Sequence, residues 1–310
     1  MNQPAKLIHA NNSTNVRFKI PPMLRLGIGA LSRLSPGLAC KLAMELFTRT
    51  PRARGLRRDE EKLLLSATPF RLKAEGHELS AWSWGDGPTV LLQHGWSSRG
   101  SHLGAFVRPL LDAGFSVVTY DAPAHGQSPG RKTNGFEISR IVLQLTRQLN
   151  GVHAVIAHSL GCSASAFAMR DGAPVGRAVF LNPPAEMETY ATLFGDSLGF
   201  PPEVIERMKA GFEAGTHLQW TDFEPENLAR GQRAPLLVIS DRNDRKVPWQ
   251  GGRDIAAAWP DGRHHATTGL GHVRVLKAPA VIEQAVNFVV GERAANAAIP
   301  KERQPVAARG

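Results

Sequence analysis

Between residues 70 and 290, short apolar runs alternate with longer segments of helical spacing, and this rhythm constrains the fold more than any other feature. Runs such as Thr89–Gln93 and Arg177–Leu181 have the length and composition of buried strands. A chain that alternates strands with helices forms a mostly parallel sheet with helices on both faces. The sequence therefore predicts the α/β class.

The alternation places the expected elements as follows. The expected strands cover residues 70–75, 78–84, 89–93, 115–120, 153–157, 177–181, 235–239 and 264–267. The first two should form a hairpin around Gly76-His77. The expected helices cover residues 100–113, 135–150, 160–170, 252–258 and 279–289. Residues from about 182 to 233 interrupt the rhythm, which predicts a small helical lid inserted into the domain.

The N-terminal segment differs from the rest of the chain. Apolar residues between Met23 and Phe47 recur at helical spacing, with a break at Ser35-Pro36-Gly37, so two short amphipathic helices are expected, and a third near 57–66. We therefore divide the chain into an N-terminal helical extension (1–66), a main domain (67–290) and a disordered tail (291–310). Residues 1–20 are polar and are expected to be mobile.

The net charge of +10 lies mainly in that extension. Residues 1–75 hold fourteen basic and five acidic side chains, so the remainder of the chain is close to neutral. That remainder shows no basic groove with interleaved aromatic residues, so a nucleic-acid partner is not expected. Two alternatives stay open for the basic amphipathic helices: they pack on the main domain, or they contact a membrane or lipid surface.

Composition and cysteine content favour a globular protein of a reducing compartment. Hydrophobic residues make up 42% of the chain and charged residues 21%, which suits a buried core. The two cysteines, Cys40 and Cys162, are too few for a disulfide framework. We recognise no secretory signal and no uninterrupted apolar stretch of membrane-spanning length, so a cytoplasmic location is expected, with peripheral membrane contact as the alternative.

One short motif carries chemistry. The segment Ala157–Gly161 (AHSLG) stands between an expected strand and an expected helix. It resembles the Gly-x-Ser-x-Gly nucleophile turn of α/β-hydrolases, with Ala157 in place of the first glycine. In that turn the serine has a strained backbone and projects its hydroxyl above the sheet. The resemblance implies that Ser159 is the nucleophile and that Leu160 gives one backbone N–H to an oxyanion hole. Its neighbour His158 is expected to be a scaffold residue.

Two further segments resemble the same family. Gln93-His94-Gly95-Trp96 follows a strand, as the oxyanion segment does in these enzymes, so the Trp96 backbone N–H would be the second oxyanion donor. The segment 121–128 (DAPAHGQS) resembles a family turn that fixes loop geometry beside the active site. We therefore expect structural roles for His94, Asp121 and His125.

The acid and the base should follow the serine in the order Ser, acid, His. The loop 241–248 (DRNDRKVP) matches the family's acid loop, and Asp244 is the expected acid, with Asp241 as the alternative. His272 lies in a glycine-flanked loop before the last helix, where the family has its base. The pair His264-His265 lacks matching carboxylates or cysteines, so no zinc site is expected.

Taken together, residues 69–290 resemble an α/β-hydrolase of the serine esterase or lysophospholipase type. The resemblance implies that Ser159, Asp244 and His272 cleave a carboxylic ester or thioester through an acyl-enzyme, with no metal or organic cofactor. Apolar residues of the lid would contact an aliphatic acyl chain. Other chemistries of the same triad stay open: thioesterase, lysophospholipase, lactonase, amidase, carbon–carbon hydrolase and perhydrolase. A non-catalytic binding protein of this fold is the remaining alternative. The sequence does not indicate an oligomeric state.

Overall fold

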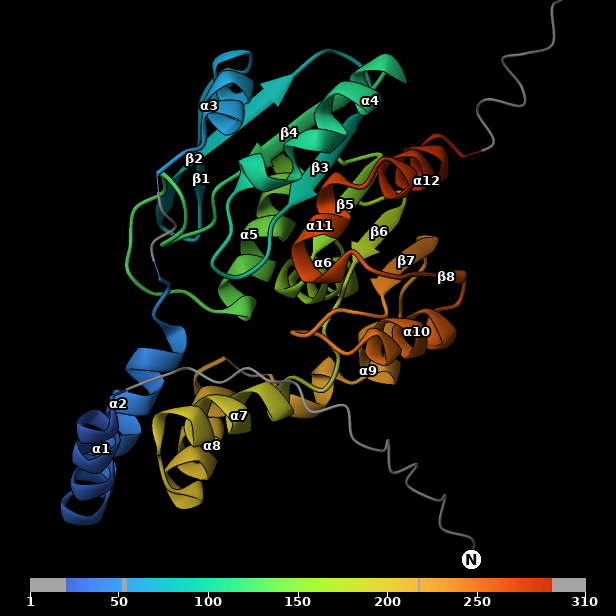
Figure 1. Cartoon of the computed structure of the whole chain (residues 1–310). Coiled ribbons are helices and arrows are strands. Elements are labelled where there is room, and N and C mark those ends of the chain that lie inside the picture. The colour runs from blue at the N-terminus through green and yellow to red at the C-terminus, as the bar shows by residue number, and fades with distance from the viewer. Residues whose placement is uncertain (1–20, 52–54, 217, 292–310) are drawn as a thin grey trace, which may run out of the picture.

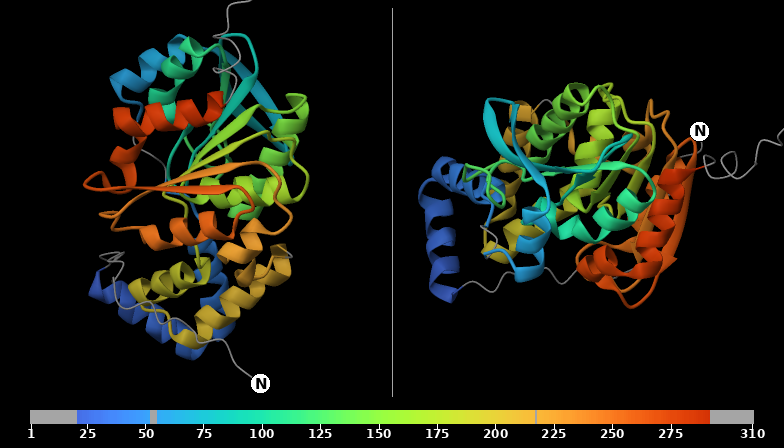
Figure 2. Two further views of the ribbon diagram at one scale, coloured as in Figure 1. Left: turned by 90° about the vertical axis from the view of Figure 1, so that its right-hand side faces the viewer. Right: turned by 90° about the horizontal axis from the view of Figure 1, so that it is seen from above.

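Figure 1 shows the computed structural model of the chain, which describes residues 21–51, 55–216 and 218–291. The segments 1–20 and 292–310, for which mobility and disorder were expected, lie outside the described residues. In Figures 1 and 2 a central sheet lies between two helical layers, and further helices form a cap below it.

The sheet has eight strands in the described part of the chain, in the order β1-β2-β4-β3-β5-β6-β7-β8. These strands are β1 (Thr68–Ala74), β2 (His77–Trp84), β3 (Thr89–Gln93), β4 (Ser116–Tyr120), β5 (Ala154–His158), β6 (Ala178–Leu181), β7 (Leu236–Asp241) and β8 (Gly262–Thr267). Strand β2 pairs antiparallel with both β1 and β4, and all other neighbours are parallel. The mostly parallel α/β sheet predicted from the sequence is confirmed.

Helices cover both faces of the sheet. One face carries α5 (Gly135–Gln148), α6 (Leu160–Arg170), α9 (Pro225–Ala229) and α10 (Trp249–Ala258). The other carries α3 (Arg58–Leu65), η1 (Gly100–Phe106), α4 (Val107–Asp112), α11 (Gly271–Arg274), η3 (Val275–Lys277) and α12 (Pro279–Val290). Every residue of β5 is buried, and its side chains alternate between the two cores, with Val155 on one face and Ile156 on the other. This two-sided burial explains why the strand reads as a continuous apolar run.

A third apolar cluster lies in the cap, at the end of the sheet where the parallel strands finish (Figure 1). It joins α1 (Pro22–Leu34) and α2 (Pro36–Thr48) to α7 (Met187–Leu198), α8 (Pro202–Thr216) and η2 (Trp220–Phe223). Proline occupies the first position of α1 and of α2, where its missing N–H costs nothing. The cap is therefore built from two segments that lie far apart in the sequence.

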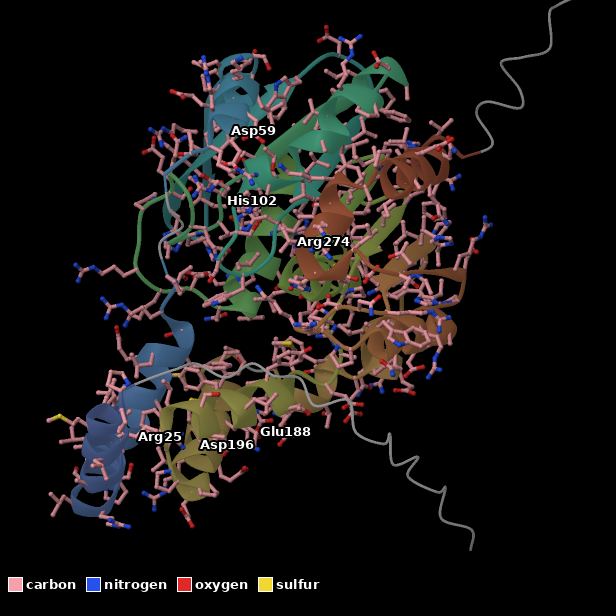
Figure 3. All side chains as sticks on the ribbon, viewed as in Figure 1. Arg25, Asp59, His102, Glu188, Asp196 and Arg274 are labelled. Atoms are coloured by element: carbon pink, nitrogen blue, oxygen red, sulfur yellow. The ribbon has the colours of Figure 1, made fainter. Side chains whose placement is uncertain are left out.

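The packing of the N-terminal helices differs from that of one continuous extension. Helices α1 and α2 pack on α7 and α8, whereas α3 places Leu63 and Leu64 against the core of the main domain. Arg25 of α1 donates a hydrogen bond to the backbone oxygen of Asp196 in α7, at 3.1 Å, and Figure 3 shows these two residues side by side. The helix expected over 100–113 begins as the 3-10 helix η1 and becomes α-helical only at Val107.

Candidate active site

Ser159 occupies a strained turn between β5 and α6. Its backbone has φ 53° and ψ −131°, a combination that costs a non-glycine residue free energy and persists only when the surroundings enforce it. Two close contacts enforce it here. A Cβ atom at Gly161 would lie 2.5 Å from the His94 carbonyl oxygen, and one at Gly95 would lie 2.8 Å from the Ser159 Cβ. The end of β3 therefore packs directly on the nucleophile turn, at a distance that only glycine allows.

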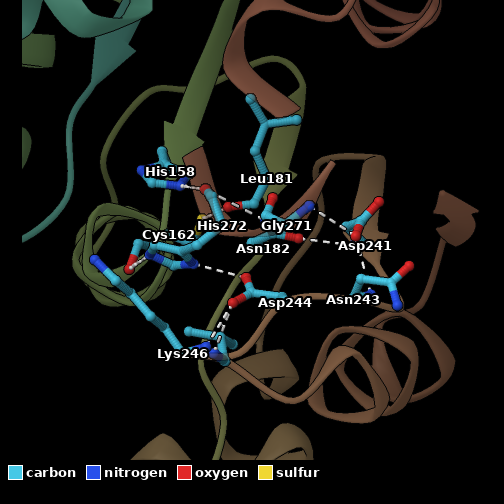
Figure 4. A network of polar contacts seen from close by, with 12 residues as sticks. His158, Cys162, Leu181, Asn182, Asp241, Asn243, Asp244, Lys246, Gly271 and His272 are labelled. Atoms are coloured by element: carbon cyan, nitrogen blue, oxygen red, sulfur yellow. Dashed lines mark hydrogen bonds and ion pairs between the residues drawn. The ribbon is translucent and has the colours of Figure 1, made fainter. Parts of the chain in front are cut away.

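Ser159, His272 and Asp244 form one hydrogen-bonded chain. The Ser159 Oγ lies 3.1 Å from His272 Nε2. His272 Nδ1 lies 2.7 Å from Asp244 Oδ2, and Figure 4 shows this contact. Because a carboxylate only accepts hydrogen bonds, Nδ1 holds the imidazole proton and Nε2 is free to accept one from the serine. The other Asp244 oxygen accepts the backbone N–H groups of Lys246 and Val247, at 2.8 and 3.0 Å. The Asp244 side chain is fully buried, so its orientation is fixed.

Asp241, the alternative acid, has a different position. One of its oxygens accepts the backbone N–H of Gly271, and the other accepts the N–H of Leu270 and the Thr267 hydroxyl, at 2.8 to 3.0 Å. Burial acts to raise the pKa of Asp241, but these hydrogen bonds and one from Asn243 outweigh it and lower the pKa. Asp241 thus holds the loop before His272 by its backbone and does not contact the imidazole in the described structure.

Two residues for which the sequence suggested no contact with the site, His158 and Asn182, form hydrogen bonds to the backbone of His272. The His158 Nε2 lies 2.8 Å from the His272 carbonyl oxygen, so it donates its proton there, and burial lowers its pKa to about 3. Asn182, directly after β6, donates to the carbonyl oxygens of Gly271 and His272 and accepts from the Asp241 N–H (Figure 4). The only sequence signal for Asn182 was its place at the carboxyl end of a strand, where parallel sheets gather their functional residues.

Two buried histidines fix the segment after β3. His94 accepts the Ala122 N–H at 3.0 Å, and His125 accepts the Ser97 N–H at 3.1 Å. Burial lowers the pKa of His94 to about 4 and that of His125 to about 3, so both rings stay neutral near pH 7. Asp121 accepts the Gly100 and Gln127 N–H groups. These contacts hold Trp96 beside the serine, where Trp96, Ser159 and Leu160 line one cavity.

That cavity has a volume of about 340 Å³ and is mostly apolar. Helices α7, α8 and η2 of the cap supply much of its wall, with Met187, Tyr190, Leu193, Phe194, Phe212, Trp220 and Phe223. Helix α2 and the residues after it supply another part, with Leu46, Phe47, Thr48, Arg49 and Pro51. The Tyr190 hydroxyl is buried without a hydrogen-bond partner in the described structure, and burial raises its pKa. The volume and the apolar lining suit a small organic ligand.

Other candidate groups lie away from this cavity. Within residues 21–51, 55–216 and 218–291, no cluster of histidine, cysteine or acidic side chains could hold a metal ion. His264 lies on β8, where its ring stacks on Trp249 at 6.0 Å. Cys162 is buried in α6, and burial raises the pKa of its thiol well above the ordinary value. Over the same ranges, no helix combines the length and apolarity needed to cross a membrane.

Comparison with known proteins agrees with the fold described above. The sequence model of the α/β-hydrolase fold family matches residues 88–234. An esterase of Pyrococcus furiosus has 20% sequence identity and a TM-score of 0.58, covering 78% of this chain and 95% of that one. A monoacylglycerol lipase of Paleococcus ferrophilus has 19% identity and a TM-score of 0.53, covering 69% and 98%. A bromoperoxidase of Bacillus anthracis has 16% identity and a TM-score of 0.53, covering 72% and 99%.

The chain has the α/β-hydrolase fold. At these identities the solved structures establish the shared fold, and their different activities do not select a reaction. A search of the curated proteins found no match to this sequence.

Proposed function

We propose that the protein is a serine hydrolase that cleaves carboxylic esters through an acyl-enzyme intermediate. The observation that carries the proposal is the hydrogen-bonded chain from Ser159 through His272 to Asp244, together with the apolar cavity that Ser159 lines. An esterase and a lipase are among the proteins of similar structure, and an ester is the bond that we propose for this triad.

The reaction follows from the proton positions. As the Ser159 oxygen attacks the ester carbonyl, His272 Nε2 takes the hydroxyl proton, and Asp244 stabilises the imidazolium. The carbonyl oxygen gains negative charge, and the backbone N–H groups of Trp96 and Leu160 are the proposed donors to it. Collapse of the tetrahedral intermediate breaks the ester C–O bond, and His272 returns the proton to the leaving alcohol.

A water molecule then completes the cycle. His272 removes one proton from the water as its oxygen attacks the acyl carbon, and the ester bond to Ser159 breaks. The serine regains a proton from His272, and the acyl group leaves as a carboxylic acid. The apolar lining of the cavity favours an aliphatic acyl chain, because burying methylene groups stabilises the complex.

Hydrolysis of p-nitrophenyl esters from acetyl to long acyl chains tests this proposal. We expect turnover by the wild type, and a loss of at least about a thousandfold in kcat for Ser159→Ala. Ser163→Ala is the matched control, because Ser163 lies one turn further along α6 and its buried hydroxyl has no partner in the described structure. Equal activity of Ser159→Ala and the wild type would refute the assignment of the nucleophile.

A further inference from the structure

The exposed apolar side chains of the protein are concentrated on one helical hairpin. Among the described residues, seven large hydrophobic side chains are strongly exposed. Five of the seven lie on α1 and α2: Met23, Leu24, Leu26, Leu34 and Leu38. Contiguous apolar exposure of this kind on a folded protein marks an interaction surface more often than scattered single residues do.

The exposed apolar residues of α1 are spaced so that they lie on one face of the helix. Met23, Leu26 and Leu34 are 84%, 74% and 87% exposed, and with exposed Ala30 they recur every three to four residues, so they share one face. Ile28, on the opposite face, is 3% exposed and packs in the cap cluster. Helix α1 is thus apolar on two faces, of which only one is covered by the described chain.

The charges beside this face are basic. Arg33 on α1 and Lys41 on α2 are exposed, and α1 contains no acidic residue. The single acid of α2, Glu45, is paired with Lys132, whose Nζ lies 2.7 Å from its carboxylate. Apolar side chains flanked by basic residues complement a surface with an apolar interior and anionic headgroups. A second protein surface would need acids placed to match, whereas a lipid surface supplies negative charge everywhere.

The position of the hairpin connects it with the active site. Helices α1 and α2 form the outer end of the cap (Figures 1 and 2). A second cavity of about 690 Å³ opens beside them, lined by Leu24, Ile28, Leu42, Leu198 and others, and here called the outer cavity. It shares Leu46, Arg49, Pro51 and Phe194 with the cavity that contains Ser159. Half-exposed Leu24 lines the outer cavity together with Ile28, on the side of α1 that faces away from Met23, Leu26 and Leu34.

We infer that the exposed face of α1 and α2 docks on an anionic lipid surface, and that the substrate is an ester taken from that surface through the outer cavity. The second half of this inference rests on the proposed function, whereas docking does not. Leucine side chains would enter the interface, and Arg33 and Lys41 would lie at the level of the headgroups. The substrate class is accordingly a lipid ester with an aliphatic chain.

Vesicle co-sedimentation of the full chain tests docking. We expect binding to vesicles of phosphatidylcholine with phosphatidylglycerol, weaker binding to phosphatidylcholine alone, and weakening by high salt. The double variant Leu26→Gln/Leu34→Gln should bind at least about tenfold more weakly, because two leucines no longer enter the apolar layer. Leu65→Gln is the matched control, since Leu65 is 79% exposed but lies on α3, outside the cap, and should bind like the wild type.

Several outcomes would overturn the inference. They are no binding by the wild type, equal binding to both kinds of vesicle, or equal binding by the wild type and the double variant. A dimer that the double variant converts to a monomer, without vesicle binding, would assign the face to a second copy. Hydrolysis of p-nitrophenyl acetate by the wild type without vesicles reports on the proposed function separately. The rate on a vesicle-borne ester relative to that acetate should fall in the double variant.

Discussion

Two aspartates at the end of β7 have separate roles at the site: Asp241 is the last residue of the strand, and Asp244 lies in the loop after it. Asp244 contacts the imidazole of His272, and Asp241 holds the backbone of the loop that carries it. The division follows from which hydrogen-bond donors each carboxylate meets. The same substitution, aspartate to asparagine, is therefore expected to impair catalysis at one position and stability at the other.

Asp244→Asn should impair catalysis more than folding. The amide cannot stabilise an imidazolium and favours the wrong tautomer, so we expect kcat to fall by about 10⁴ while the melting temperature changes little. Steady-state kinetics and thermal unfolding of the same preparation measure both quantities. Near wild-type kcat would contradict the role proposed for Asp244.

Asp241→Asn should impair folding first. The amide nitrogen replaces one of the two carboxylate oxygens, so it faces the N–H of either Leu270 or Gly271, and the remaining hydrogen bonds lose their charge. We therefore expect the free energy of unfolding to drop by about 2 to 3 kcal/mol. Urea unfolding checks this. An unchanged midpoint, with activity lost as completely as in Asp244→Asn, would mean that Asp241 is the acid that acts.

The sequence motifs predicted the three triad residues, but not the residues that contact them only in the folded chain. Motif order indicated Ser159, Asp244 and His272, and the structure brings these three side chains into contact. The contacts of His158 and Asn182 with the His272 carbonyl oxygen were not predictable. They join atoms of three segments that are far apart in the sequence: the end of β5, the residue after β6, and α11. The pattern of one segment does not indicate which backbone group of another segment it will meet.

Among the elements, the cap departs most from what the sequence indicated. Helical spacing showed that α1 and α2 have an apolar face, but not that this face would meet α7 and α8. Phe47 makes this packing specific, with ring centroids 5.2 Å from Phe194 and 6.2 Å from Trp220. The strands and helices of the main domain were predictable because their alternation has few three-dimensional solutions. Helices α1 and α2 lie far from α7 and α8 in the sequence, so the sequence allowed several places for them to pack.

Phe47→Ala tests the contribution of α2 to the cavity. Removing a half-buried ring that lines the Ser159 cavity should enlarge it, so we expect the preferred acyl chain of the ester panel to become longer or bulkier. The free energy of unfolding should drop by about 2 kcal/mol. Phe70→Ala, at a half-buried ring on β1 outside the cavity, should lose stability without changing chain preference. Identical chain preference in Phe47→Ala and the wild type would show that α2 does not shape the cavity.

For the molecule as a whole, three buried neutral histidines make stability depend on pH. Burial lowers the pKa from 6.5 to about 4 for His94 and to about 3 for His125 and His158. Below about pH 6.5 the unfolded chain binds protons at these positions and the folded chain does not. Their stabilising contribution is therefore complete above that pH and is lost as the pH falls toward 4.

We expect the free energy of unfolding to fall by about 3 to 4 kcal/mol per pH unit between about pH 6 and pH 4. Asp121 opposes this decline in part, because burial raises its pKa. Urea unfolding at several pH values measures the slope. A free energy of unfolding that stays constant over this window would show that the three histidines are protonated in the folded protein.

Covalent labelling with a fluorophosphonate tests whether Ser159 is an activated nucleophile, because only a serine with a working base reacts readily. The labelled protein would be digested and the adduct located by mass spectrometry, in the wild type and in Ser159→Ala. We predict a single adduct on Ser159 that is absent from the variant. No adduct in the wild type, or an adduct on another serine, would show that Ser159 is not the activated nucleophile.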